Sequence, residues 1–584
     1  MLLRAFAFLM LVASAPAALN IMPLKDVRAG MKATGRTVFS GGTVETFQAE
    51  ILGILENVGP RQSIILARLS GGPLEHTGVM QGMSGSPVYV DGKLIGAVAL
   101  AFPGAKDPIA GIRPIEEMLA LDTLPAAPAQ RPSAPLADLA ALFPAEPHQP
   151  PGDMRQGDMR LVEVANPVAF SGFTSGTIEQ FAPRLREYGL EPRQGISLGG
   201  ASSLQMGDPS RLEPGSMISV QLMTGDMSAG ADGTLTAIDG NRMYAFGHRF
   251  LAVGPTSLPF TRSEVITLLA NVNTSFKISA AKELMGVISQ DRSTAVTGTL
   301  GAAASLVPLD IEVRESGRAV TSYHVNIVND RFLSPFLLQM ATFSAIDATQ
   351  RSAGAFSIGI KGAIEFENRP APVEIGGAYA GDNAVTMQAA VSTAIPLAYI
   401  MQGGFDSLRL KRIRLTIDAV NSKRELDIAS VFVSRREVKP GDTVELTVML
   451  EGENGGELAR AVQYTIPAGA GPGLLNFTVA DGAQTSLAEL RQIIMTTASS
   501  PDQLLANVSR IRPGDKAYVR VWRPEPAWAV RGEELRDPPP SVALVLGAAQ
   551  SLPQNRNSKI TELIIDSGGS LVTGSKTVQV EVKP

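Results

Sequence analysis

Short runs of β-branched and other apolar residues, separated by turns that contain glycine or proline, recur along almost the whole chain. Alternation of this kind predicts half-buried strands. One hairpin is marked clearly, because Asp91 and Gly92 separate the strand-forming runs 87–90 and 93–98, and both turn positions favour positive φ. The 57 glycines, the 40 prolines and an aromatic fraction of only 5% agree with a turn-rich chain. The sequence therefore predicts a mainly β protein.

Length, charge and residue content exclude several classes of function. A chain of 584 residues predicts several domains, and a net charge of -5 gives no reason to expect nucleic acid or an anionic membrane surface as a partner. The absence of cysteine excludes thiol catalysis, disulfides and cysteine-based metal sites. The 4 histidines are scattered without paired spacing, and no acidic metal-binding loop or phosphate-binding glycine loop is present. We therefore expect no metal and no other cofactor.

The first residues have the pattern of an export signal. Arg4 precedes the apolar run 5–18, which contains the small-x-small cleavage pattern Ala15-Pro16-Ala17. The alternative is a membrane anchor, but the run is shorter than the ~20 residues that a spanning helix needs, and no later segment reaches that length without charges. We expect a cleaved signal peptide over residues 1–17, no stable membrane span after its cleavage, and export to the periplasm or the extracellular medium of a bacterium.

Composition divides the rest of the chain into four parts. Residues 22–122 form a first β-rich part, and eight prolines among alanines between Pro125 and Pro151 predict a semi-rigid linker over 123–158. A second β-rich part, 159–425, is predicted with one or two helices, and the run 384–391 ("AVTMQAAV") is interpreted as a strand. In residues 426–584, short strands with proline and glycine turns predict an immunoglobulin-like β-sandwich with a helical insertion over 486–511.

Ser84 stands between glycines in the stretch "QGMSGSP", residues 81–87, directly before the hairpin. A serine hydroxyl becomes an effective nucleophile when a base takes its proton and backbone N–H groups face the oxyanion that forms. Glycine in a tight turn allows successive amides to point to one side, so the amides of Gly82 and Ser84 are candidate oxyanion-hole donors. The alternative interpretation is a turn whose small residues only permit close packing.

The longer stretch around Ser84 resembles a known family. The segments "VETFQAEILGILE", "GPLEHTGVMQGMSGSPVYVDGKLIGAVALAF" and "IAGIRPIEEML" are similar to the SpoIVB-type serine peptidases, family 55 of the serine peptidases. The resemblance covers residues 22–121. It implies a chymotrypsin-like double β-barrel, a protein or peptide substrate, and Ser84 as the nucleophile.

A second region of resemblance lies downstream. The segment "SAGADGTLTAIDGNRMYAFGHRFLAVGP", followed by "GVISQDRSTAVTGTLG", is similar to the part of the family that carries the catalytic histidine in a Gly-His pair. In this chain the pair is Gly247-His248, so the resemblance implies His248 as the base. Wide separation in sequence is no objection, because catalytic triads are recognised by geometry and role.

The chain departs from the family pattern in two ways. The family runs histidine first and serine last, whereas here Ser84 precedes His248, so we expect the two halves of the core in swapped, permuted order. The family also has an acidic triad member upstream of the nucleophile, at a position near Ser70, where this chain has no carboxylate. The third member is left unassigned, with these candidates: Glu75, Asp232, Asp239 and Asp291. A chain without it would be slow, would work as a serine–histidine dyad, or would be inactive.

The other histidines are weaker candidates. His76 precedes the serine loop, His148 lies in the predicted linker, and His324 alternates as a strand residue. Two functions follow from the sequence. The first is an exported serine endopeptidase that uses Ser84 and His248. The second is an inactive exported peptide-binding or scaffold protein that keeps the peptidase fold. The peptide-binding PDZ module of the best-known family members has no convincing counterpart in this chain.

Overall fold

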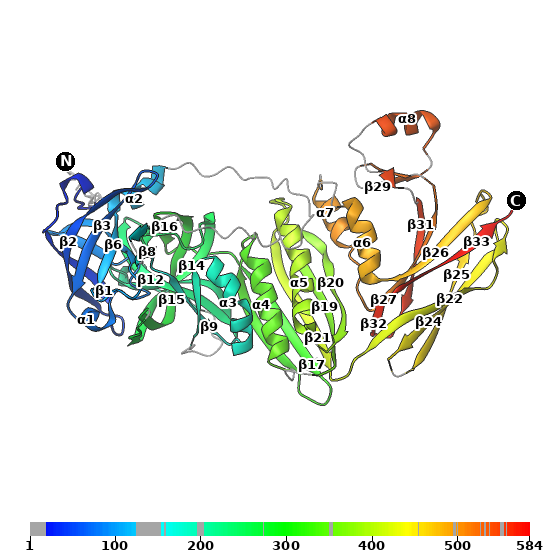
Figure 1. Cartoon of the computed structure of the whole chain (residues 1–584), viewed down its shortest axis with the longest axis horizontal. Helices are drawn as coiled ribbons and strands as arrows, with labels where there is room; N and C mark the ends of the chain where they lie inside the picture. The colour runs from blue at the N-terminus through cyan, green and yellow to red at the C-terminus, as the bar shows by residue number, and fades with distance from the viewer. Residues whose placement is uncertain are drawn as a thin grey trace, which may run out of the picture.

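The structure is a computed structural model. It describes residues 19–123, 154–156, 159–195, 204–272, 274–349, 354–382, 384–453, 455–493, 498, 500–525, 527–530, 533–536, 538–548, 554–555 and 558–584. The predicted signal peptide, 1–17, and most of the predicted linker, 124–153 and 157–158, lie outside the described residues. Three parts follow one another along the long axis of the molecule, from the blue N-terminal barrel to the yellow and red C-terminal sandwich (Figure 1).

The first part is a closed barrel of six strands, which we call barrel one. Its strands are β1 (Lys32–Val38), β2 (Val44–Gly59), β3 (Gln62–Ser70), β4 (Pro87–Val90), β5 (Lys93–Ala101) and β6 (Ile109–Pro114). They pair in the order β4-β1-β2-β3-β6-β5, and β4–β5 pairing closes the ring. Asp91 and Gly92 have φ of 49° and 73°, so the predicted hairpin has positive φ at both turn positions. The short elements are η1 (Leu24–Asp26), α1 (Leu74–Thr77), α2 (Ile115–Leu119) and η2 (Ala120–Thr123).

A second closed barrel follows, which we call barrel two. Its strands are β11 (Met217–Gly225), β12 (Ser228–Asp239), β13 (Arg242–Ala245), β14 (Gly254–Leu269), β15 (Phe276–Arg292) and β16 (Ala295–Leu300). They pair in the order β12-β13-β16-β15-β14-β11, and β12–β11 pairing closes the ring. The chain reaches this barrel through β7 (Met154–Gln156) and β8 (Met159–Glu163). β8 extends the sheet of barrel one by pairing with β5.

The sheet of barrel two continues on both sides into a helix-covered layer. On one side lie β9 (Asn166–Ser171), α3 (Ser175–Glu187) and β10 (Leu190–Gln194). On the other lie β17 (Leu306–Glu315), β18 (Thr321–Val328), β19 (Phe356–Phe366), β20 (Arg369–Gly381) and β21 (Leu410–Val420), with helices α4 (Leu333–Asp347) and α5 (Val385–Gln402). η4 (Pro209–Arg211) precedes β11. The helices α3, α4 and α5 stand side by side in the middle of the molecule (Figure 1).

Two predictions for this part are wrong. The run 384–391 is not a strand, because all but its first residue belong to α5, and the described residues of the region hold three long helices rather than one or two. Apolar residues of α5 such as Val385 and Leu397 are fully buried in the main hydrophobic core, which also takes in α4. A helix that is apolar around much of its circumference has no clear helical period, so a short window of it resembles a buried strand.

The C-terminal part is a sandwich of two sheets. One sheet has the order β25-β24-β22-β32 and the other the order β23-β33-β26-β27-β31. The mainly β class, with a barrel core followed by a sandwich, is thus confirmed. The strands are β22 (Glu425–Val433), β23 (Glu437–Val438), β24 (Thr443–Gly452), β25 (Glu457–Thr465), β26 (Gly473–Asp481), β27 (Lys516–Arg523), β31 (Ser558–Asp566), β32 (Leu571–Thr573) and β33 (Ser575–Val582).

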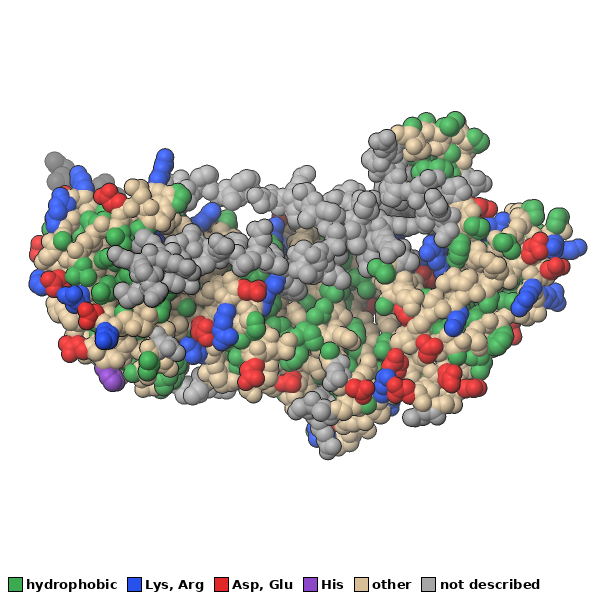
Figure 2. All heavy atoms as spheres, viewed as in Figure 1, with side chains coloured by type: hydrophobic (Ala, Val, Ile, Leu, Met, Phe, Trp, Pro, Cys, Tyr) green, Lys and Arg blue, Asp and Glu red, His purple; other side chains and the backbone are tan. Residues whose placement is uncertain are grey.

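Helices interrupt this sandwich between β26 and β27. They are α6 (Gly482–Ile493) and α7 (Pro501–Val508), and α7 packs towards α5, where Asn507 Nδ2 donates to Tyr399 Oη over 3.1 Å. A small projection carries β28 (Ala527–Val530), β29 (Glu533–Arg536), α8 (Pro540–Ala548) and β30 (Gln554–Asn555). Hydrophobic side chains gather on α8, and acidic and basic side chains are scattered over the rest of the visible face among further hydrophobic ones (Figure 2). No helix in the described ranges has the length and apolar character needed to cross a membrane.

The two barrels are docked against each other. Buried side chains of barrel one, such as Ala97 and Ile115, form a cluster with Tyr244 and Ala295 of barrel two. The backbones also bond across the interface, since Gly41 and Val265 exchange two hydrogen bonds of 2.8 and 2.7 Å. The parts that bear the candidate serine and the candidate histidine therefore form one core.

Candidate active site

The serine loop, residues 81–86, is held by barrel two rather than by its own barrel alone. Thr234 N donates to Ser84 O over 2.8 Å, and Thr234 Oγ1 donates to Gly82 O over 2.9 Å. Thr236 Oγ1 donates to Gly85 O over 2.7 Å. These three bonds attach consecutive parts of the loop to β12. The serine that the sequence placed in a turn of barrel one thus lies at the junction of the two barrels.

The loop fixes the orientation of the two candidate oxyanion-hole amides and leaves their N–H groups without an acceptor among the described residues. Within the described part of the chain, the N–H groups of Gly82 and Ser84 donate no hydrogen bond, whereas those of Met83, Gly85 and Ser86 each do. The carbonyl that shares a peptide plane with each free N–H is fixed. Gln81 O accepts from Lys277 N over 3.2 Å, and Met83 O accepts from Ser86 N over 2.9 Å. Because the peptide group is planar and trans, fixing the carbonyl also fixes the opposite direction of the N–H.

His248 lies in the loop that follows β13, close to the strand that the serine loop also contacts. A side chain on Gly247 would lie 3.3 Å from Ala97 Cβ and 3.2 Å from Ala99 Cβ of β5. Between these two alanines, Val98 O accepts from the amide of Gly85 over 2.7 Å. The Gly247 carbonyl is fixed by Arg113 Nε of barrel one over 3.3 Å. The structure therefore brings the Gly247-His248 pair and the serine loop to the same strand.

The hydrogen bond of His248 selects one tautomer of its ring. Nδ1 lies 2.6 Å from the carbonyl oxygen of Arg249. A carbonyl oxygen can only accept, so this bond places a proton on Nδ1 and leaves the lone pair on Nε2 in the neutral ring. Burial lowers the pKa of His248, and the nearby charge of Glu163 opposes this effect. The neutral form, with Nε2 free to accept a proton, is therefore favoured.

Ser84 and His248 are both buried and each has an unused polar atom. Ser84 is 0% exposed and His248 is 1% exposed. Neither Ser84 Oγ nor His248 Nε2 has a hydrogen-bond partner, so the structure does not join them by a hydrogen bond. A buried polar atom without a partner costs about 1–3 kcal/mol. The two atoms that catalysis would have to join are thus both left unsatisfied.

Glu163 is the carboxylate that acts on His248, and the sequence did not single it out. It ends β8, where Leu100 of β5 pairs with it, and it forms an ion pair with Arg249 over 3.3 Å (Nε–Oε2). Glu163 makes no hydrogen bond to the imidazole, since Nδ1 is already bonded to the Arg249 carbonyl. It acts on the ring through its negative charge. No local motif marks Glu163, since it reaches the site through pairing between β8 and β5.

Asp291 supports the loop of His248 rather than its ring. Its carboxylate accepts from the amides of Phe250 (2.8 Å), Leu251 (2.6 Å) and Val253 (3.4 Å). Burial raises the pKa of Asp291 to about 6, although these amides favour the charged form. Of the acidic candidates from the sequence, this is the one that organises the chain directly after His248.

We expect Asp291→Asn to loosen this loop. The new amide NH2 would face N–H donors, so at least one buried backbone amide would lose its acceptor, at a cost of about 1–3 kcal/mol. Hydrogen exchange of a peptide that spans residues 246–254, together with thermal unfolding, measures the effect. Asp239→Asn is the matched control, because Asp239 is exposed at the turn between β12 and β13 and should change stability by no more than about 0.5 kcal/mol. Equal exchange in both variants would contradict the role of Asp291.

The remaining sequence candidates lie away from the His248 ring. Asp232 is buried on β12 and accepts from Ser279 Oγ, and Glu75 is exposed on α1. His76, also exposed on α1, is near the rim of a cleft, and His324 on β18 bonds Asp310 Oδ1 through Nδ1 over 2.9 Å at the surface. His148 lies outside the described residues. In the ranges described, no group of three or more acidic or histidine side chains is arranged to hold a metal ion.

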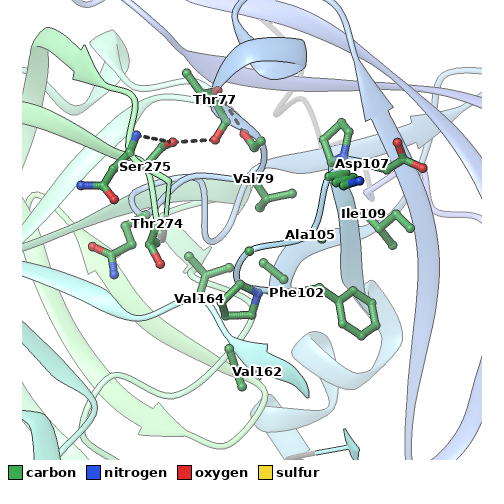
Figure 3. A pocket seen from close by; sticks show the side chains of 18 of the residues that line it. Thr77, Val79, Phe102, Ala105, Asp107, Ile109, Val162, Val164, Thr274 and Ser275 are labelled. Atoms are coloured by element: carbon green, nitrogen blue, oxygen red, sulfur yellow. Dashed lines mark hydrogen bonds between the residues drawn. The ribbon is translucent and has the colours of Figure 1, made fainter. Parts of the chain in front are cut away.

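A cleft of about 270 Å³ opens between the barrels next to the serine loop. One wall comes from barrel one, with Thr77, Val79 and the β5–β6 loop, and the other from Thr274 and Ser275 of barrel two (Figure 3). Ser275 Oγ donates across the cleft to Thr77 O over 2.6 Å. The cleft reaches Gln81, which adjoins Gly82, and Glu163. Ser84 and His248 do not line it.

The serine-bearing segment of the chain matches a known family. Residues 11–119 match the SpoIVB peptidase S55 family model. The resemblance of this segment to the SpoIVB-type peptidases is therefore confirmed, and the segment includes the whole serine loop. The match ends in α2 and does not reach His248, so the order of the two halves stays a prediction. No curated protein matches the chain, and no solved structure does.

At the level of the family, the segment 11–119 is thus SpoIVB peptidase-like. The segment matched to the SpoIVB peptidases supplies the serine, the two free amides and one wall of the cleft. Barrel two, outside the match, supplies the histidine and the three bonds that hold the serine loop.

Proposed function

We propose that this protein is an exported serine endopeptidase that cleaves a protein substrate with Ser84 as nucleophile and His248 as base. The observation that carries the proposal is the attachment of the serine loop to β12 of barrel two, which brings the Ser84 loop and the His248 loop to the same strand, β5. A loop whose only task was close packing would not need free amides at Gly82 and Ser84 together with an unpartnered hydroxyl and imidazole nitrogen. Export follows from the N-terminal signal pattern.

The chemistry assigns one role to each group. Ser84 Oγ attacks the carbonyl carbon of the scissile bond while its proton passes to His248 Nε2. The oxygen that becomes negative is stabilised by the N–H groups of Gly82 and Ser84. His248 then gives the proton to the departing amine, and a water molecule, deprotonated by Nε2, hydrolyses the acyl-enzyme. The Arg249 carbonyl takes the orienting place that a carboxylate has in a full triad, which makes this a serine–histidine dyad.

Access to Ser84 requires a local movement. The cleft is lined by Gln81 and Glu163 but not by Ser84, whose side chain is fully buried. Catalytic hydrogen bonds are often long in a resting enzyme and form only when substrate is bound. We therefore propose a resting state in which the amides are already oriented and in which substrate in the cleft brings Ser84 Oγ and His248 Nε2 into contact.

A serine-reactive fluorophosphonate tests the proposal. Ser84 Oγ would attack phosphorus, fluoride would leave, and the hydroxyl proton would pass to His248 Nε2. We expect a single label, mapped by mass spectrometry to Ser84, and no label in Ser84→Ala. Ser86→Ala should still be labelled at Ser84, although more slowly because Ser86 Oγ bonds Thr37 Oγ1 under the loop, and this label excludes the neighbouring serine as the reacting group. If folded wild-type protein resists the probe as fully as Ser84→Ala does, the chain is instead an inactive peptide-binding or scaffold protein with a peptidase fold.

A further inference from the structure

Lys277 is a buried cationic side chain directly behind the serine loop. It stands near the start of β15, and only 2% of its surface is exposed. A Cβ on Gly82 would lie 3.2 Å from Lys277 Cδ. The methylene groups of Lys277 therefore pack against the α-carbon of Gly82, one of the two proposed oxyanion-hole residues. Its backbone N–H donates to Gln81 O over 3.2 Å. Both the main chain and the side chain of Lys277 therefore contact the loop.

The ammonium group of Lys277 begins a chain of hydroxyl groups under the loop. Nζ donates to Thr37 Oγ1 over 2.8 Å, and Ser86 Oγ donates to the same oxygen over 3.1 Å. Ser86 Oγ also lies 3.5 Å from Thr234 Oγ1, which in turn donates to Gly82 O. The chain connects β15 with β1 of the opposite barrel and with the serine loop on either side of Ser84.

Charged groups from two other strands act on Lys277. Asp232 of β12 is buried and Glu45 of β2 is exposed, and the negative charge of each favours the ammonium form. Burial outweighs both and lowers the pKa of Lys277 to about 7. An isolated buried ammonium group is costly, and side chains held at such a cost are most frequent at functional sites.

We propose that Lys277 is a positioning residue of the peptidase site, whose ammonium group holds the serine loop through Thr37 and Ser86 and keeps the Gly82 and Ser84 amides oriented toward the reacting oxygen. This inference rests on the proposed function. A charge-assisted hydrogen bond is about twice as strong as a neutral one, so loss of the Lys277 proton weakens the hold on the loop. The site is then competent only while His248 is neutral and Lys277 is charged.

The fluorophosphonate rate at Ser84, followed against pH in the purified full chain, tests this. We expect a rise as His248 loses its proton and a fall centred at about pH 7 as Lys277 loses its own. Lys277→Met should lower the maximal rate by about tenfold to a hundredfold and remove the alkaline fall. Lys277→Arg, which stays charged, should retain more of the rate than Lys277→Met and also lack the fall. Lys282→Met is the matched control, because Lys282 lies on the same strand but is paired at the surface with Glu264 over 3.2 Å.

A second variant separates a positioning charge from a merely structural lysine. Asp232→Asn removes a negative charge that raises the pKa of Lys277, so the alkaline fall should move to lower pH. A fall that persists in Lys277→Met, or that does not move in Asp232→Asn, would overturn the proposal.

Hydrogen exchange distinguishes failure of this inference from failure of the proposed function. After correction for intrinsic rates, the hydrogen-bonded amides of Met83, Gly85 and Ser86 should lose protection as pH rises through 7 in the wild type, but not in Lys277→Arg. If the wild type takes no label yet shows this step, the peptidase proposal fails and Lys277 still positions the loop. If the step is missing, the inference about Lys277 is wrong whether or not Ser84 reacts.

Discussion

Replacing His248 with glutamine is expected to slow the reaction of Ser84 with a fluorophosphonate by about 10²- to 10⁴-fold. Glutamine retains polar character at a fully buried position but offers no basic nitrogen at neutral pH. Burial lowers the pKa of His248, so the wild-type rate should rise with pH with a midpoint below 6.5, the ordinary value for histidine. This rise should be absent from His248→Gln. The measurement is the second-order rate of phosphonylation, followed by intact mass over a range of pH.

His248→Gln is needed to assign the rise of the rate with pH to His248, because other groups titrate in the same range. Burial raises the pKa of Asp232 and of Asp291 to about 6, so a pH profile of the wild type alone does not identify the base. His76→Gln is the matched control, since His76 is exposed on α1 near the cleft and bears no proposed proton-transfer role. It should keep both the rate and the profile. A His248→Gln protein that is folded and reacts as fast as the wild type would remove His248 from the mechanism.

Local features of the sequence were predictable because their physical cause is local. The positive φ of Asp91 and Gly92 follows from a two-residue turn between strands, and the glycines around Ser84 indicate a tight loop wherever they occur. Among the residues that the structure describes, the N–H groups of Gly82 and Ser84 donate no hydrogen bond, and their role as oxyanion-hole donors stays a prediction. The family resemblance then supplied the predicted role of Ser84, and the segment that contains Ser84 matches the SpoIVB peptidase S55 family model.

The parts that were missed or left open depend on pairing between distant segments. Glu163 reaches His248 only because β8 adds to β5, and Asp291 reaches the backbone after His248 only because β14 and β15 pair. Lys277, in a strand-like run, would ordinarily be assigned to a solvated face, and docking of the two barrels buries it. The helix α5 was missed for a related reason, since burial by the sheet and by α4 removes the polar face that makes a helical period visible.

Docking of the barrels around the serine loop is the physical condition on which the site depends, and Gly85 is where it can be broken most directly. Gly85 has φ of +93°, and a Cβ there would lie 1.9 Å from Thr234 O and 2.5 Å from Phe246 N. Both are backbone atoms of barrel two and cannot move aside as a flexible side chain can. We expect Gly85→Ala to separate the loop from β12, to lower the stability of the double barrel by about 4 kcal/mol or more, and to abolish labelling of Ser84.

Gly92→Ala is the control that distinguishes the steric clash of Gly85→Ala from the cost of positive φ alone. Gly92 has a similar φ of +73° in the same barrel, but a Cβ there would meet nothing within 4 Å, so alanine costs only the left-handed conformation, about 1–2 kcal/mol. Thermal unfolding and limited proteolysis of the two variants compare their stabilities, and labelling reports the site. If docking holds the serine loop, Gly92→Ala keeps its label while Gly85→Ala loses it. Equal stability and equal labelling in the two variants would mean that the loop does not need barrel two. In that case Ser84 and His248 would belong to separate structures, and no dyad would join them.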